Sequence, residues 1–458
     1  MHQSPERKRP RLLLGVLMGL LSAAATAQPD TATLLERQSE EAFRQVLQQP
    51  QDLALWSTYG RLLVQAGNYE GGIAALERLL LNPDAPPELR VEVATLYFRL
   101  GSYAMAESMV RVALADNRLQ GDQRSLANAL LVDVLKRNRR TQFSGAATFG
   151  LRHQTNPMYR TDSGQVLSGG LLVPLPATPA RESDTDLNLG LRMQHGYDLE
   201  LQNSGAIVST FGAYLVDYRS SSGSQLQANP TKPYDLVLLD FTTGFRFKPV
   251  PGQLSGLTLR PHLILSNLWA QGHQYLRNQG LGLDLAWQFD ERTLLEFTLD
   301  GQDRKFANRI DIANADLLGG RLYGARARIG RDLGGGQFLA GEYGFRSNRT
   351  RRDIYDYESN EGRVTYSVAY PGPVTKGGYW TTSVWLGVLR RAYGTPDPAV
   401  SAVETRKDRE WRFGVSQTVP FSPVWSVVLT AEQSRNNANL PNFRYKNTSL
   451  SGVVVRSF

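Results

Sequence analysis

The sequence predicts an α-helical repeat domain followed by a transmembrane antiparallel β-barrel, and three observations lead to this fold class. Apolar residues recur at helical spacing up to residue 140 and at every second position after it. The first residues have the three parts of an export signal. The last residue, Phe458, closes the alternating segment "SLSGVVVRSF", at a place where soluble domains usually leave loose polar residues.

The N-terminus predicts a secretory signal peptide over residues 1–27. The basic stretch "RKRPR" precedes the apolar run "LLLGVLMGLLSAAA", and the small-residue pattern "ATA" ends at Ala27. The alternative is a transmembrane anchor, but the apolar run is short for a span, which needs about 20 residues. The chain has 0 cysteines, which excludes a lipid anchor on cysteine, disulfides and a thiol nucleophile.

Residues 28–140 are predicted to form a helical domain of the tetratricopeptide type. Two helix pairs repeat with the 34-residue period of such repeats, so that Gly67 matches Gly101 and Tyr69 matches Tyr103. These glycines are expected to end the first helix of each pair, and small residues are expected to let the paired helices approach closely. The alternative is a pair of helical hairpins that are not tetratricopeptide repeats. The small positions are Gly60, Gly72, Ala94 and Ala106.

The first helices of the two pairs are expected to line a concave groove that receives a client. Phe98 stands beside Arg61 and Arg99, and an apolar anchor with basic neighbours suits an extended peptide better than a sugar chain. The alternative is that this groove packs on the mouth of the barrel. The groove positions in the 34-residue register are Ser57, Arg61, Val64, Gln65, Glu88, Val91, Thr95, Phe98 and Arg99.

Residues 141–458 are predicted to form a 14-stranded antiparallel outer-membrane β-barrel. Long alternating segments begin near residues 143, 185, 206, 234, 257, 275, 293, 317, 337, 361, 379, 408, 424 and 445. Connections after the even segments are short and several after the odd segments are longer, as in such barrels. The longest, 155–183, is the candidate gate of the lumen. Pro261 has no backbone amide hydrogen to donate to a neighbouring strand, so a bulge is predicted at this position.

An even strand count places both ends of the barrel in the periplasm, and the helical domain with them. Phe458 resembles the terminal aromatic residue that the barrel-insertion (Bam) machinery recognises, and outer-membrane lipid is the other expected partner. Aromatic residues at the strand ends are expected to form interfacial girdles. These are Tyr197, Tyr218, Tyr234, Trp269, Tyr275, Trp287, Tyr343, Tyr379, Tyr393 and Trp425.

Nothing in the sequence predicts an enzyme, a metal site or a cofactor. After the signal, the histidines are His153, His195, His262 and His273, and only His262 is predicted to face the lumen, without a serine or carboxylate motif beside it. The net charge is +8, but the arginines are scattered along the sequence, so they do not predict a nucleic-acid-binding surface. Mixed charges are expected to pair across strands and to line a wet lumen, chiefly Arg192, Arg260, Glu296, Asp300, Arg326, Arg328, Glu342 and Arg412.

A secreted chain with a short tetratricopeptide domain and a 14-stranded barrel resembles the Slam family, the surface lipoprotein assembly modulators of the type XI secretion class. The stretch "FSGAATFGLRHQTNP" resembles the start of the barrel in that family. The resemblance implies translocation of a cognate periplasmic protein, such as a lipoprotein, to the cell surface, with the repeats capturing the client. An exopolysaccharide export porin is the alternative, and an outer-membrane lipase is disfavoured by the missing Ser/His motif.

Overall fold

The computed structural model describes residues 30–458 except 176–181, 202–203, 222–225, 227–229, 251, 253, 255 and 375–377. The predicted signal peptide lies outside the described residues. The chain divides into two compact units, Met1–Arg139 and Arg140–Phe458, each described by itself below. This boundary agrees with the change of periodicity in the sequence.

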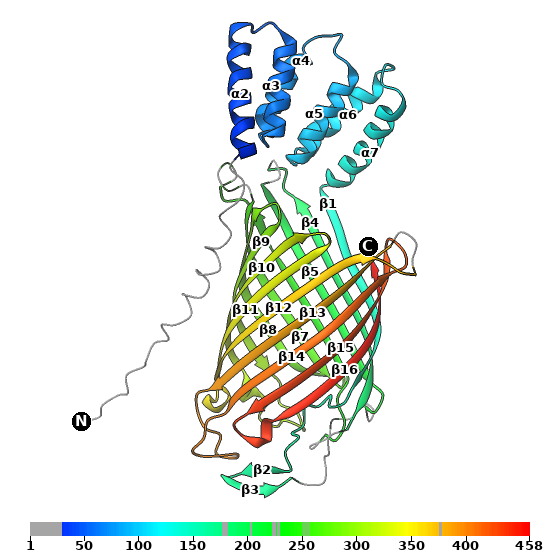
Figure 1. Cartoon of the computed structure of the whole chain (residues 1–458). Coiled ribbons are helices and arrows are strands. Elements are labelled where there is room, and N and C mark those ends of the chain that lie inside the picture. Colours follow the sequence, from blue (N-terminus) through cyan, green and yellow to red (C-terminus); the bar gives the residue numbers. More distant parts are fainter. Residues whose placement is uncertain are drawn as a thin grey trace, which may run out of the picture. The chain divides into compact units, whose positions relative to one another are not determined.

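The first unit consists of α-helices (Figure 1). They are α2 (Asp30–Gln48), α3 (Leu53–Gln65), α4 (Tyr69–Leu79), α5 (Pro87–Arg99), α6 (Tyr103–Ala115) and α7 (Gly121–Arg137). The α3–α4 hairpin recurs as the α5–α6 hairpin with the same numbering offset that the sequence predicts. None of the described helices combines the length and the apolarity that a helical membrane span requires.

Glycines set the shape of the helix pairs. Gly67 and Gly101 have φ values of +83° and +75°, so each takes the left-handed conformation that ends a helix. A Cβ atom on Gly72 would lie 2.5 Å from Cγ2 of Val64 and 3.2 Å from the carbonyl oxygen of Gly60. The α3 and α4 backbones therefore approach as closely as the sequence predicts.

Two apolar clusters hold this unit together. Ile73 and Leu76 of α4 pack on Leu89, Val93 and Leu96 of α5. The second cluster joins α5 to α6 and α7 through Val91, Ala113, Leu119 and Ala127. Each cluster spans neighbouring helices, so the helices depend on one another for burial of their apolar faces.

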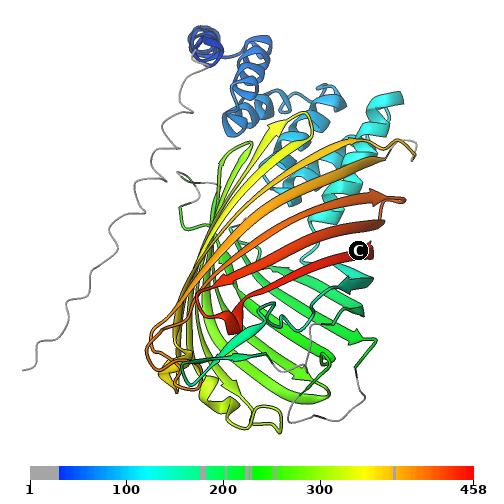
Figure 2. The ribbon, with the colours of Figure 1, turned by 60° about the horizontal axis from the view of Figure 1, so that its bottom comes forward.

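The second unit is a closed antiparallel barrel of fourteen strands. Consecutive strands pair, and β1 pairs with both β4 and β16, which closes the wall (Figure 1). The strands cross the wall obliquely (Figure 2). They are β1 (Thr141–Gln154), β4 (Asp184–Asp198), β5 (Gly205–Tyr218), β6 (Leu236–Phe247), β7 (Leu257–Ala270), β8 (His273–Asp290), β9 (Thr293–Phe306), β10 (Gly320–Gly334), β11 (Gln337–Thr350), β12 (Tyr357–Pro371), β13 (Tyr379–Tyr393), β14 (Lys407–Pro420), β15 (Trp425–Ala438) and β16 (Tyr445–Ser457).

Alternation along the strands gives the barrel two different faces. Outward positions carry large apolar side chains that no protein atoms cover, such as Leu281, which is 66% exposed, and Val364, which is 56% exposed. Inward positions carry the polar and charged side chains. A closed barrel with an apolar exterior and a polar interior is the architecture of a membrane-spanning barrel.

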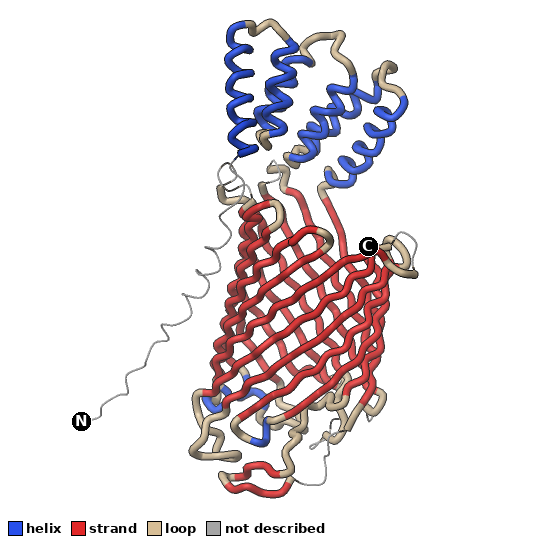
Figure 3. Tube along the Cα trace, in the orientation of Figure 1, coloured by secondary structure: helices blue, strands red, loops and turns tan. Residues whose placement is uncertain are grey.

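The longer connections lie at the barrel end opposite Phe458, together with the short 3-10 turns (Figure 3). There the chain between β1 and β4 forms a small hairpin, β2 (Gln165–Ser168) and β3 (Leu171–Pro174). The sequence predicted this connection as a long loop but did not predict its hairpin. Part of the loop, 176–181, lies outside the described residues.

Three local predictions were wrong. Pro261 keeps its register with β8, and no bulge forms there. On the β6 side, Pro261 has no paired residue, and the register shift of β7 lies between Leu268 and Trp269.

The predicted girdle residue Tyr218 is paired with Asp186 and only 7% exposed, so it faces the lumen and not the lipid. The predicted girdle residue Tyr393 is paired with Tyr357, which lines a lumen cavity, so it also lies on the inward face. Tyr218 and Tyr393 are the last residues of β5 and β13, where a shift of one residue moves a side chain to the other face.

Candidate functional site

The candidate site is the lumen of the barrel, where the register brings together charges that are far apart in the sequence. All eight charged residues predicted for the lumen occupy inward positions. Five of these eight residues take part in cross-strand ion pairs in the described barrel. The pairs are Arg260–Asp284 at 3.0 Å, Arg326–Glu342 at 3.4 Å and Arg328–Glu296 at 2.6 Å. Pairing across strands is what the sequence led us to expect of a wet lumen.

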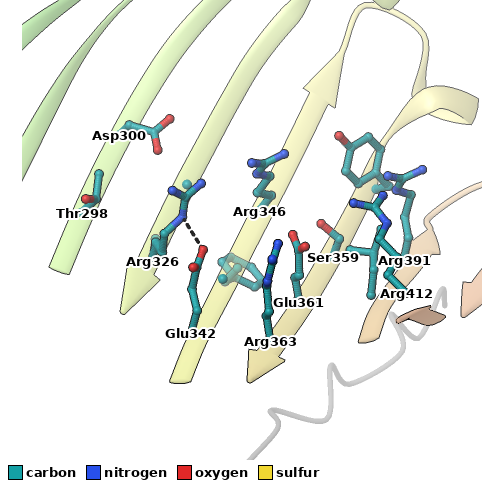
Figure 4. A pocket seen from close by; sticks show the side chains of 16 residues that line it. Thr298, Asp300, Arg326, Glu342, Arg346, Ser359, Glu361, Arg363, Arg391 and Arg412 are labelled. Atoms are coloured by element: carbon teal, nitrogen blue, oxygen red, sulfur yellow. Dashed lines mark ion pairs between the residues drawn. The ribbon is translucent and has the colours of Figure 1, made fainter. Parts of the chain in front are cut away.

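The described lumen contains a cavity of about 430 Å³ against strands β9 to β14. Thr298, Asp300 and Glu342 line it together with an arginine cluster (Figure 4). We use the name arginine cluster for Arg326, Arg346, Arg363, Arg391 and Arg412. Five arginines face three carboxylates in the lining, since Glu361 is the third, so the cavity carries a formal charge of 5 − 3 = +2.

A second cavity of about 500 Å³ continues along the same wall. The two cavities share Thr298, Arg326, Glu342 and Arg363 in their linings. The free space therefore runs along β9–β12 past the ion pairs instead of ending at them. This wall is hollow at two successive levels, which a barrel filled by side chains would not be.

The sequence alone did not identify Arg363, Arg391 and Glu361 as lumen residues. Arg363 alternates with Val364 and Tyr366, so period-two alternation through "EGRVTYSV" could have placed it inward. Arg391 is one of two adjacent arginines in "VLRRAY", and only the register with Ser359 decides which of them faces inward.

At the loop-bearing end, inward side chains form a buried polar network around Asp186. This carboxylate has no exposed surface and accepts hydrogen bonds from Arg152 Nε at 2.9 Å and from Gln154 Nε2 at 3.2 Å. Asn447 of β16 donates to Gln154 Oε1 at 3.1 Å and accepts from the backbone amide of Asn156 at 2.9 Å. The network joins β16, β1 and β4 below the longest loop, and satisfied buried polar groups of this kind hold a fixed geometry.

The candidate gate, loop 155–183, is fastened to other loops. The amide of Leu167 donates to Oδ1 of Asn442, and Nδ2 of Asn442 donates to the Leu167 carbonyl, each over 2.9 Å. Gly169 and Gly170 donate backbone hydrogen bonds to Ala399 and Val400. The hairpin is therefore linked to the β13–β14 and β15–β16 connections. Its role as a gate stays a prediction.

The helical unit presents only part of the predicted groove. Val91 is 2% exposed and packs against Leu119 and Ala127, so it is not accessible to a client. Val64 packs against the first apolar cluster. The sequence analysis placed α7 beside the repeats but did not predict that α7 would cover this face of α5. Val91 is therefore removed from the candidate client surface, whereas Val64 is half-buried.

The remaining groove residues are exposed or half-buried, namely Ser57, Arg61, Gln65, Glu88, Thr95, Phe98 and Arg99. Arg61 Nε lies 3.7 Å from Oε1 of Glu92. Phe98 lies 5.5 Å from the Tyr103 ring, and the Arg137 guanidinium lies over it at 5.7 Å. Phe98 thus has packing partners of its own, and the accessible Arg61 and Arg99 share this surface with Glu88 and Glu92.

Tyr97 connects the two helix pairs on the other side of α5. Its hydroxyl donates to Oε1 of Glu77 over 2.6 Å. Burial and this hydrogen bond to a carboxylate raise the pKa of Tyr97 to about 12. The contact links α4 to α5 and so supports the packing of one repeat on the next.

The barrel histidines offer no catalytic arrangement among the described residues. His262 faces the lumen, is 8% exposed, and lies between the Arg260 carbonyl at 3.1 Å and Asp284 Oδ2 at 3.4 Å. No serine hydroxyl of the described chain is bonded to it. His195 faces outward and stacks on Phe143. The described residues also hold no group of three or more His, Asp or Glu side chains placed to bind a metal.

Comparison with known proteins places the chain in no family, since no family model and no curated sequence matches it. Among solved structures, an outer-membrane channel of Pseudomonas putida F1 is 14% identical over 69% of this chain and 96% of its own, with a TM-score of 0.33. An anion-selective porin of Comamonas acidovorans is 10% identical over 69% and 99%, with a TM-score of 0.35. The channel DcaP of Acinetobacter baumannii is 7% identical over 69% and 97%, with a TM-score of 0.37.

Proposed function

We propose that the chain is an outer-membrane translocator that moves a cognate protein from the periplasm to the cell surface. In this proposal the barrel is the conduit and the tetratricopeptide-like helical unit receives the client, as in the Slam family that the sequence resembles. A surface lipoprotein is one such client. No catalytic step is assigned to the chain.

The observation that carries the proposal is the hollow, charged lumen inside a closed barrel with an apolar exterior. Cavities of about 430 and 500 Å³ follow one another along the inner wall. Charged groups line the path, so a polar chain in transit would exchange water contacts for contacts with the wall. An apolar or fully packed lumen would not support transport of a polar cargo.

The barrel topology supports a periplasmic helical unit. The chain enters the barrel at Thr141 and its last strand returns to the same end, where Ala146 pairs with Ser457. The shorter connections lie at this end, as the periplasmic turns of outer-membrane barrels do. The helical unit precedes β1 directly in the chain and would meet clients in the periplasm, while Phe458 would be presented to the barrel-insertion machinery.

Export of an acidic exopolysaccharide is the second candidate function. The observation that favours it is the excess of arginine over carboxylate in the 430 Å³ cavity. The helical surface around Arg61 and Arg99 is compatible with either cargo. The half-buried Phe98 beside these arginines favours a peptide, because an apolar anchor with basic neighbours suits an extended polypeptide.

A surface-shaving experiment separates the two functions. Intact cells with and without the gene are treated with protease, and the released peptides are quantified by mass spectrometry. We expect one or a few proteins to disappear from the surface and to accumulate in the periplasm, with recovery on complementation. An unchanged set of surface proteins together with loss of an extracellular acidic polymer would instead establish polysaccharide export.

A further inference from the structure

We propose that the arginine cluster is a binding site for the carboxylate groups of an extended acidic polypeptide segment, one with acidic residues four positions apart. This inference rests on the proposed protein cargo and specifies the chemistry of the part that crosses the lumen. It concerns the barrel wall alone and needs no contribution from the helical unit.

The strand register arranges four of the five arginines in two rows. Across β11, β12 and β13, Arg346 pairs with Ser359 and Ser359 pairs with Arg391. In the second row, on β12, β13 and β14, Arg363 pairs with Gly387 and Gly387 with Arg412. Each row therefore holds two arginines, one on each side of a small residue.

These rows have the dimensions of carboxylate sites. Neighbouring strands lie about 4.8 Å apart, so the two arginine backbones of a row are separated by about 10 Å. Arginine side chains are long enough to converge over a serine or a glycine between them. Because a guanidinium binds a carboxylate through two parallel hydrogen bonds, two guanidinium groups over one small residue can hold one carboxylate from both sides.

Arg412 is bound to Glu410 at 2.7 Å. The other three arginines of the two rows have no complete carboxylate partner among the described residues. Arg346 makes no ion pair or hydrogen bond with the described residues. Arg363 lies over the Trp385 ring at 5.0 Å and donates only a 3.4 Å hydrogen bond to Thr365. Arg391 approaches Asp408 at 3.9 Å, yet its buried Nε has no hydrogen-bond partner. A buried donor without a partner costs free energy that a bound carboxylate would recover.

Spacing along β12 favours an extended peptide. Ser359 and Arg363 are four positions apart on β12, which separates the rows by about 13 Å along the strands at 3.3 Å per residue. The row centres, Ser359 and Gly387, lie on neighbouring strands, about 4.8 Å apart sideways. Residues i and i+4 of an extended polypeptide lie on one face, also about 13 Å apart. Glu361 stands between the rows on the same face and would repel a carboxylate at i+2. The wall therefore matches the pattern acidic-x-x-x-acidic.

Binding of labelled peptides to the purified full-length chain in detergent micelles tests this assignment. The probes share one glycine–serine background and carry paired glutamates at i and i+4 or at i and i+2. We expect the i, i+4 peptide to bind more tightly. The double variant R346Q/R391Q should weaken its binding roughly tenfold or more, since two charge-assisted contacts are lost, and added salt should weaken it further.

R390Q/R409Q is the matched control, because it removes the same two charges from paired outward positions on β13 and β14, outside the described cavity. It should leave binding within about twofold of the wild type. Equal losses in both double variants would overturn the site, as would equal binding of the two glutamate spacings. Tighter binding of oligogalacturonate than of the i, i+4 peptide would overturn the assignment to a polypeptide.

The outcomes remain separable from those of the proposed function. A surface protein that depends on the chain but passes normally through R346Q/R391Q overturns this site and leaves protein translocation standing. Peptide binding that behaves as expected while the surface proteins are unchanged overturns the proposed function and leaves the carboxylate site standing.

Discussion

Phe458 and Gly145 exchange two backbone hydrogen bonds at the closing seam of the barrel. The amide of Phe458 donates to the Gly145 carbonyl over 3.0 Å, and the amide of Gly145 donates to the Phe458 carbonyl over 2.9 Å. A Cβ atom on Gly145 would lie 2.7 Å from Cζ of Phe458, so the phenylalanine ring occupies the space that the glycine leaves free. The last residue of the chain thus fastens the last strand to the first.

Deletion of Phe458 is expected to reduce the amount of inserted barrel. The deletion removes both hydrogen bonds to Gly145 and the terminal aromatic side chain, and an unclosed seam leaves strand edges with unsatisfied backbone groups. The measurement is the outer-membrane level of heat-modifiable barrel, with proteolysis in the periplasm as the companion readout. Phe458→Tyr keeps the ring and the backbone bonds and serves as the control. Wild-type levels of the deletion variant would contradict the expectation.

Replacement of Asn442 by leucine is expected to release the β2–β3 hairpin. Both side-chain hydrogen bonds to Leu167 are lost, while the backbone bonds at Gly169 and Gly170 remain. We expect faster limited proteolysis within 155–175 on whole cells and a higher single-channel conductance in planar bilayers. Asn439→Leu is the control, because that side chain bonds to Lys407 and Thr405 and not to the hairpin. Unchanged conductance in the Asn442 variant would remove the loop from consideration as a gate.

Substitution of Arg61, Phe98 and Arg99 by alanine is expected to lower surface display of the client several-fold, as loss of an anchor and its basic rim does at other interfaces. Barrel levels should not change, because these residues belong to the helical unit. Phe98 also contacts Tyr103, so the double variant R61A/R99A is the version that spares this packing. R37A/R44A on α2 removes two exposed charges elsewhere and should display normally. Full display by the triple variant would exclude this surface as the client receptor.

The helical unit is expected to lose stability at high pH through Tyr97. The fold raises the pKa of this tyrosine from 10.0 to about 12, so the folded state holds the hydroxyl proton more tightly than the unfolded chain does. The resulting stabilisation is complete below pH 10 and is lost as the pH rises through 12, a decrease of roughly 1–2.5 kcal/mol in the free energy of unfolding. Urea unfolding followed by the helical circular dichroism signal measures it. Tyr97→Phe should lack this decrease. If the free energy of unfolding fell with pH in the same way in both proteins, the decrease would not come from Tyr97.

The large elements of this fold were predictable because each follows from a local period. The two 34-residue helix pairs, the left-handed glycines Gly67 and Gly101, and the fourteen alternating segments all appear in the structure within a few residues of their expected positions. Parity along a strand then fixed which charges face inward, as Arg326 and Glu342 show. Local periodicity therefore predicted which residues form the wall of the lumen. It did not predict which charged residues pair with each other.

Features that depend on long-range packing were not predictable. The position of α7 over α5 decides that Val91 is buried, and nothing in the α5 segment distinguishes it from an exposed groove residue. The arginine cluster combines residues from β10 to β14, and Arg391 faces inward only because the register pairs it with Ser359. A single-residue error in a strand start would have placed it in the lipid.

Crosslinking through a single lumen cysteine tests most directly whether a polypeptide passes through this barrel. The chain contains 0 cysteines, so Thr365→Cys places a unique thiol in the cavity, and Val364→Cys, on a residue that is 56% exposed on the outer face, is its neighbour control. Each thiol carries a photo-activated crosslinker in cells that express the client found by surface shaving. We predict a covalent adduct between the client and position 365 but not position 364. Normal surface display of the client without an adduct at position 365 would contradict passage through the lumen.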